Sequence, residues 1–175
     1  MPQIAKIDRS PKLNTFLAPI QLQDKGRGLN AQALCDTGAD VYLSIRPSLA
    51  RKVAQRLELP IKKLPKPLDF GDFNGKVTAR ATEYLRLTLQ IDGRQFPRQK
   101  FILLETAHDV FIGQEWWTKH RVGLFPATRS FVWPNDLPVR IRPPDLPSES
   151  RLGSTSHAEP GIGQGSTYSG FKRVS

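Results

Sequence analysis

The residues whose types and order suggest catalysis lie in one short segment of this sequence, residues 33–44, which reads ALCDTGADVYLS. An apolar stretch leads into Asp36, then Thr37 and Gly38 follow, and the chain returns to apolar residues. This order predicts that Asp36 lies at the tip of a tight turn at the edge of the core. A carboxylate in that place can meet another carboxylate, an arrangement suited to general acid–base chemistry. Gly38 permits a close backbone approach, and the Thr37 hydroxyl can turn inward to bond neighbouring backbone.

The other reactive side chains do not suggest a second site. Cys35 is the only cysteine, so the chain has neither an intramolecular disulfide nor a clustered ligand set for structural zinc, and we expect no metal. No basic residue adjoins Cys35, which we interpret as a small buried hydrophobe rather than a nucleophile. We expect His108 at the start of a strand and His120 at the end of a helix, and we interpret Trp116 and Trp117 as packing residues.

The elements that must position Asp36 are mostly short strands separated by turn signals, which predicts an all-β barrel or sandwich. Residues 84–91 alternate apolar and polar side chains, and Asp92 and Gly93 then form the sharpest hairpin signal in the chain. The other predicted strands are 16–22 and 29–34, joined by a turn at 24–28, and 94–104.

Two helices interrupt the strands. Residues 47–58 repeat apolar side chains at every fourth position, begin with proline and must end before Pro60. Residues 114–120, which follow Gly113, are long enough for a short helix.

Composition divides the chain into a folded part and its flanks. The 175 residues carry 26 basic and 16 acidic side chains, a formal net charge of +10. The Pro-, Gly- and Ser-rich residues 140–175 are predicted to be a disordered tail, residues 1–11 an N-terminal extension, and residues 12–139 the domain. Neither a signal peptide nor an apolar run of about 18 residues is recognisable, so we expect a cytoplasmic location and no membrane contact.

Several segments together resemble one protein family. Residues 36–40, DTGAD, resemble the active-site motif of retroviral-type aspartic proteases, the retropepsins, and most closely those of gypsy-type long-terminal-repeat retrotransposons. Residues 48–59 are similar to the helix that the retrotransposon enzymes place after this motif. Residues 108–117, HDVFIGQEWW, look like the family's second signature, two apolar residues and a glycine before a short helix. Gln114 follows that glycine where retroviral enzymes typically have arginine, which favours the retrotransposon branch.

The resemblance implies an all-β, retropepsin-like closed barrel with one or two short helices, and an aspartic endopeptidase without a cofactor. In this family two carboxylates share a proton and activate a water molecule, so Asp36, Thr37 and Gly38 are the expected catalytic residues. The chain contains a single Asp-Thr/Ser-Gly triplet, so the active enzyme must be a homodimer with a two-fold axis between two copies of Asp36. The expected substrate is a peptide or a retroelement polyprotein.

The resemblance also implies a mobile hairpin, a flap, which we expect at residues 69–78, with an ordinary surface hairpin as the alternative. Asp40 is expected to hold the substrate backbone, or else to cap the turn that follows it. The expected substrate-binding residues are Ala39, Asp40, Phe73, Asn74, Gly75 and Ile112.

Other interpretations remain open. Residues 46–66 carry a local excess of six basic side chains, which suits a weak nonspecific RNA contact, although a solvated basic face is the commoner outcome. A retropepsin-like module could also keep the fold and dimerise without catalysis. Residues 130–133 could pair with a second chain in the dimer or fold back on their own chain.

Overall fold

The computed structural model describes residues 16–72, 74–141 and 172–174. The predicted N-terminal extension (1–11), Phe73 and most of the predicted tail lie outside these ranges. The described parts of the tail are ordered, which differs from the prediction: the N–H groups of Arg140 and Ile141 bond the Gly93 carbonyl oxygen, and residues 172–174 form a strand. An open sheet edge elsewhere in the chain supplies hydrogen-bonding groups for them, which the composition of the tail could not reveal.

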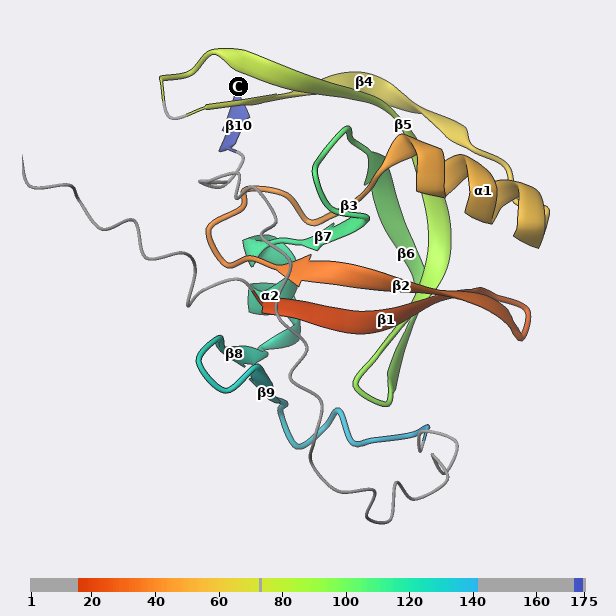
Figure 1. Ribbon diagram of the computed structural model, residues 1–175, viewed down its shortest axis with the longest axis vertical. Coiled ribbons are helices and arrows are strands. Elements are labelled where there is room, and N and C mark those ends of the chain that lie inside the picture. The colour runs from red at the N-terminus through yellow and green to blue at the C-terminus, as the bar shows by residue number, and fades with distance from the viewer. Residues whose placement is uncertain (1–15, 73, 142–171, 175) are drawn as a thin grey trace, which may run out of the picture.

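Six strands form a closed barrel, which confirms the predicted all-β fold class (Figure 1). Around the barrel they follow the order β1 (Phe16–Asp24), β2 (Arg27–Cys35), β7 (Val110–Ile112), β3 (Leu43–Ile45), β6 (Arg94–Leu103) and β5 (Val77–Ile91). Pairing of β1 with β5 closes the barrel. From β5 the sheet continues to β4 (Lys62–Gly71), and β10 (Lys172–Val174) pairs with the outer edge of β4.

The length of β5 differs from the prediction of 84–91 for a physical reason. Its second half pairs with β6 and β1 and lines the barrel, so every second side chain from Leu85 to Ile91 is buried. Its first half pairs with β4 beyond the barrel and is largely exposed. The strict apolar alternation that reveals a strand in the sequence is therefore present only in the barrel half.

Both predicted helices are present. Helix α1 (Pro47–Leu57) begins with proline, buries four apolar side chains, and ends where Glu58 adopts a left-handed conformation with φ of 57°. Helix α2 (Gln114–His120) follows Gly113 and buries Trp116 and Trp117. No helix among residues 16–72 and 74–141 is long and apolar enough to span a bilayer.

The segment after α2 folds back on its own chain. Strands β8 (Gly123–Phe125) and β9 (Ser130–Val132) pair antiparallel. The ring of Phe131 stacks on Phe16, with ring centroids 4.8 Å apart, and on Trp117, with centroids 5.6 Å apart. Of the two alternatives left open for residues 130–133, packing within one chain is the arrangement that the structure describes.

Strand β7 provides the link between the two signature segments. It pairs parallel with β2, where Ile112 lies opposite Cys35, and antiparallel with β3, where Ile112 lies opposite Leu43. Residues 36–42 therefore connect β2 to β3, the two strands that flank Ile112 of β7. This topology brings residues 36–42 and Gly113 together, although about 70 residues separate them in the chain.

Candidate active site

Asp36 lies directly after the end of β2 and is partly buried. Its backbone N–H donates to the Ile112 carbonyl oxygen at 3.1 Å. Its Oδ1 accepts a hydrogen bond from the Gly38 N–H at 2.8 Å, which fixes the orientation of the carboxylate. Oδ2 accepts no hydrogen bond from the residues that the structure describes. One carboxylate oxygen thus organises the turn, while the other is available for a partner outside it.

The two residues after Asp36 behave differently. A Cβ atom on Gly38 would lie 3.3 Å from Asp36 Oδ1, closer than most side chains tolerate, so glycine suits this position. Thr37 is exposed, and its hydroxyl has no hydrogen-bond partner within the described ranges. The prediction that this hydroxyl turns inward is therefore wrong for the single chain, because the neighbouring backbone groups bond one another and Asp36 instead.

The second signature segment forms hydrogen bonds with residues 36–42, the loop that carries Asp36. Gly113 donates its N–H to the Tyr42 carbonyl oxygen, and Gln114 donates to the Ala39 carbonyl oxygen, both at 3.1 Å. A Cβ atom on Gly113 would lie only 1.6 Å from the Val41 carbonyl oxygen, so no side chain fits there. Glycine is required at this point because two backbone segments touch.

Trp117 has a role that sequence reasoning missed. Its indole Nε1 donates to the Ile112 carbonyl oxygen at 2.8 Å, the same oxygen that accepts the Asp36 N–H. Through this bond, helix α2 supports the Asp36 loop in a chain that has Gln114, directly after Gly113, where retroviral enzymes typically have arginine. A signal was available, since a buried tryptophan usually needs a partner for its N–H.

The predicted substrate-binding residues separate into two groups. The side chains of Ala39 and Ile112 are fully buried within the chain, so only their backbone could reach a substrate. Asp40 is only partly buried, and its Oδ2 accepts the backbone N–H of Arg173 at 2.9 Å. A cavity of about 170 Å³ lies here between the loop and β4, with Asp40, Phe70 and Arg173 among its lining residues.

The predicted hairpin exists at residues 69–78. Asp72 Oδ1 accepts the N–H groups of Asn74 at 2.9 Å and Lys76 at 3.1 Å, and Gly75 adopts φ of +79° in the turn. The hairpin formed by β4 and β5 projects beyond the barrel, and β10 lies beside it (Figure 1). Phe73 lies outside the described residues, and the role of the hairpin as a flap stays a prediction.

Burial governs the titration of the nearby cysteine and of both described histidines. Desolvation raises the pKa of the Cys35 thiol to about 12. Burial, and secondarily Arg46, lowers the pKa of His108, just before β7, while burial and Lys119 lower that of His120 at the end of α2. Both histidines lie where the sequence predicts them. Among the described residues no three His, Cys, Asp or Glu side chains gather in a way that could hold a metal ion.

We expect Cys35 to resist alkylation in the folded protein. Only the thiolate reacts, and the raised pKa and burial of Cys35 keep it protonated and covered. Iodoacetamide at pH 8 should modify the native chain at least about a hundredfold more slowly than the chain in guanidinium chloride. The time course is measured by mass spectrometry. Similar rates in the two states would contradict the interpretation of Cys35 as a buried, unreactive residue.

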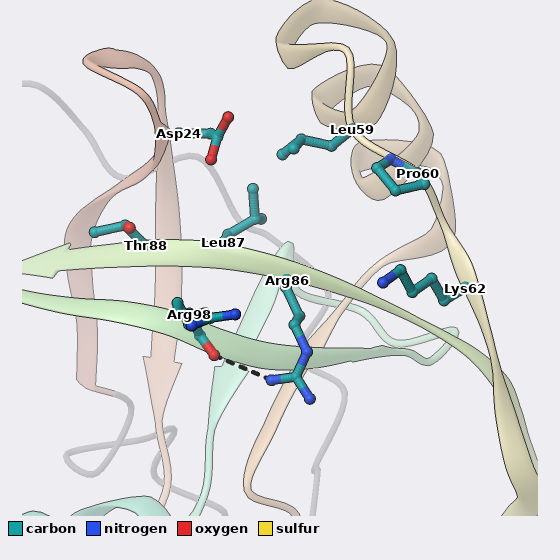
Figure 2. Close-up of a pocket in the computed structure, with 8 residues that line it drawn as sticks. All are labelled: Asp24, Leu59, Pro60, Lys62, Arg86, Leu87, Thr88 and Arg98. Carbon is teal, nitrogen blue, oxygen red and sulfur yellow. Dashed lines mark hydrogen bonds between the residues drawn. The ribbon is translucent and has the colours of Figure 1, made fainter.

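A second, larger cavity of about 260 Å³ lies at the other end of the barrel (Figure 2). Phe16 pairs with Cys35 beside the Asp36 loop, and Asp24, which lines this cavity, is eight residues further along β1, roughly 26 Å away. Lys62, Arg86 and Arg98 also line it. Sequence reasoning placed the basic surface at residues 46–66 and missed the arginines that β5 and β6 add. The nonspecific RNA contact stays a prediction.

Comparison with known proteins supports the fold. No protein-family model matches the sequence, and no curated protein sequence matches it. Among solved structures, the chain is similar to the retroviral protease-like domain of Ddi1 from Leishmania major, with a TM-score of 0.51. The alignment covers 77% of this chain and 99% of that one at 15% sequence identity. The fold is therefore retropepsin-like.

Proposed function

We propose that this chain is a retropepsin-type aspartic endopeptidase that acts as a homodimer. The observation that carries the proposal is the Asp36 loop. The barrel is retropepsin-like, and the Gly38 N–H orients the Asp36 carboxylate. The Asp36 backbone N–H donates to the Ile112 carbonyl oxygen, and the other carboxylate oxygen is unbonded by the described residues. The bond from the Gly38 N–H is that of an Asx turn, and the second oxygen, next to the exposed Thr37, is free to meet a further carboxylate.

Dimerisation follows from the chemistry. A lone carboxylate cannot both accept a proton from water and donate one to the scissile carbonyl oxygen, whereas two carboxylates that share a proton can do both. No hydrogen bond joins Asp36 to a second carboxylate among the described residues. A second copy, related by a two-fold axis, would supply the second Asp36. Thr37, next to Asp36, is exposed, as an interface at this two-fold axis would require.

The proposed reaction proceeds without a covalent acyl-enzyme. The ionised Asp36 takes a proton from water as the water oxygen attacks the peptide carbonyl carbon, and the protonated Asp36 donates to the carbonyl oxygen. A tetrahedral intermediate with two hydroxyl groups forms. The Asp36 that took the water proton gives it to the amide nitrogen, the C–N bond breaks, and one hydroxyl proton returns to the other Asp36, which leaves an amine and a carboxylic acid. The substrate would lie extended between the Asp36 loop and the β4–β5 hairpin. A retroelement polyprotein remains the expected natural substrate because of the sequence resemblance.

We expect the initial rate of peptide cleavage to rise more steeply than in proportion to the protein concentration when the protein is dilute. If two chains form one site, the initial rate rises with the square of the concentration below the dimer dissociation constant and becomes proportional above it. Initial rates on a peptide mixture, measured alongside sedimentation velocity at the same concentrations, test this. Cleavage by a chain that sediments as a monomer, at a rate proportional to concentration throughout, would overturn the dimeric site.

A further inference from the structure

Strand β10 adds a short extended segment to the hairpin that lies above the candidate site. Residues 172–174 pair antiparallel with β4, with Lys172 opposite Gly71, Arg173 opposite Phe70 and Val174 opposite Asp69. The contact joins parts of the chain about 100 residues apart. Addition of a strand to an open sheet edge is a common way in which proteins bind extended peptides.

The opposite edge of β10 faces the Asp36 loop. The Arg173 N–H donates to Asp40 Oδ2 at 2.9 Å. Because successive N–H groups of a strand point to opposite sides, the N–H of Arg173 points away from β4, and those of Lys172 and Val174 point toward it. Strand β10 thus lies between β4 on one side and Asp40 on the other.

The surroundings of Arg173 favour a basic residue. Arg173 lines the cavity of about 170 Å³ that also has the acidic residues Asp40 and Glu115 in its lining, with Lys100 as the other basic lining residue. The remainder of the lining is largely apolar, including Phe70 and Ile102. An extended peptide with a basic residue at this position therefore meets complementary charge and an apolar surface.

We propose that residues 172–174 occupy the peptide-binding cleft as a tethered, substrate-like strand, so that the chain blocks its own site until another peptide displaces the strand. The same contacts assign the cleft to extended peptides with a basic residue opposite Phe70. This inference rests on the proposed function, since it takes the space between Asp40 and β4 as the place of the substrate. A covalently attached strand competes with any added peptide at an effective concentration set by its tether.

The test measures binding of a fluorescent peptide with the sequence of residues 170–175, GFKRVS, by fluorescence anisotropy. All proteins are full-length and carry Asp36→Asn, so that cleavage cannot affect the result. Arg173→Pro removes the N–H that bonds Asp40, whereas the matched control Arg173→Lys keeps both that N–H and the charge. We expect the proline variant to bind the peptide about tenfold or more tightly than the parent, and the lysine variant to bind like the parent. A GFKEVS peptide should bind more weakly to all three proteins.

A second measurement needs no added peptide. Hydrogen exchange should show protection of the backbone amides of Asp69 and Gly71, which lie opposite Val174 and Lys172, in the parent and the lysine variant, and loss of that protection in the proline variant. Equal peptide affinity in all three proteins with unchanged exchange, or no peptide binding by any of them, would overturn the inference. Absence of cleavage by the chain that keeps Asp36 would instead overturn the proposed function, so the two failures are distinguishable.

Discussion

Replacement of Asp36 with asparagine is expected to lower kcat/KM for peptide cleavage by a factor of about 10³ or more and to leave the fold intact. Asparagine has nearly the same shape, and its Oδ1 can still accept the Gly38 N–H that bonds Asp36 in the native loop. The amide cannot take a proton from water or share one with its counterpart. In a homodimer the substitution removes both carboxylates at once.

The matched control is Asp136→Asn. Asp136 is an exposed carboxylate that pairs with Arg121 on the surface, and its replacement should leave cleavage and stability nearly unchanged. Cleavage rates and thermal unfolding are compared for the three proteins. If Asp36→Asn cleaves peptides as fast as the parent, Asp36 is not the catalyst. If no protein cleaves, the chain is a retropepsin-like module without activity, the alternative that the sequence leaves open.

Gly113→Ala is expected to destabilise the protein by at least about 3 kcal/mol, and any folded fraction should be inactive. The added Cβ would lie 1.6 Å from the Val41 carbonyl oxygen, 2.7 Å from its carbonyl carbon and 2.9 Å from the Ala39 carbonyl oxygen. All three are backbone atoms, so no change of rotamer can relieve the contact. The loop of residues 36–42 would have to move away from Gly113, and Asp36 would move with it.

Chemical denaturation measures this change in the free energy of unfolding. Gly123→Ala is the control, because its added Cβ would make only ordinary contacts, the nearest at 3.5 Å from the Val132 side chain. We expect that substitution to change stability by less than about 1 kcal/mol. A Gly113→Ala protein as stable and active as the parent would show that the contact between the two signature segments is not needed to position Asp36.

The elements that the sequence predicted well are those with a strong local pattern. The four-residue apolar repeat of α1, the alternation in the second half of β5 and the turn at Asp92 and Gly93 each appear in the structure near their predicted positions. In each case the pattern extends over a few neighbouring residues. The first half of β5 has no such pattern, because it pairs with β4 beyond the barrel and its side chains are largely exposed, and the prediction did not include it.

The sequence by itself therefore determined the single Asp-Thr-Gly triplet, the glycine of the second signature and the helices and hairpins around them. Only the tertiary structure decided that Gly113 touches the backbone at Val41, that the Trp117 indole shares the Ile112 carbonyl oxygen with Asp36, and that β10 lies between β4 and Asp40. The physical reason is one of range. Helical and strand periodicity is written in residues two to four positions apart, whereas these contacts depend on which sheet edges and backbone segments meet after the chain has folded.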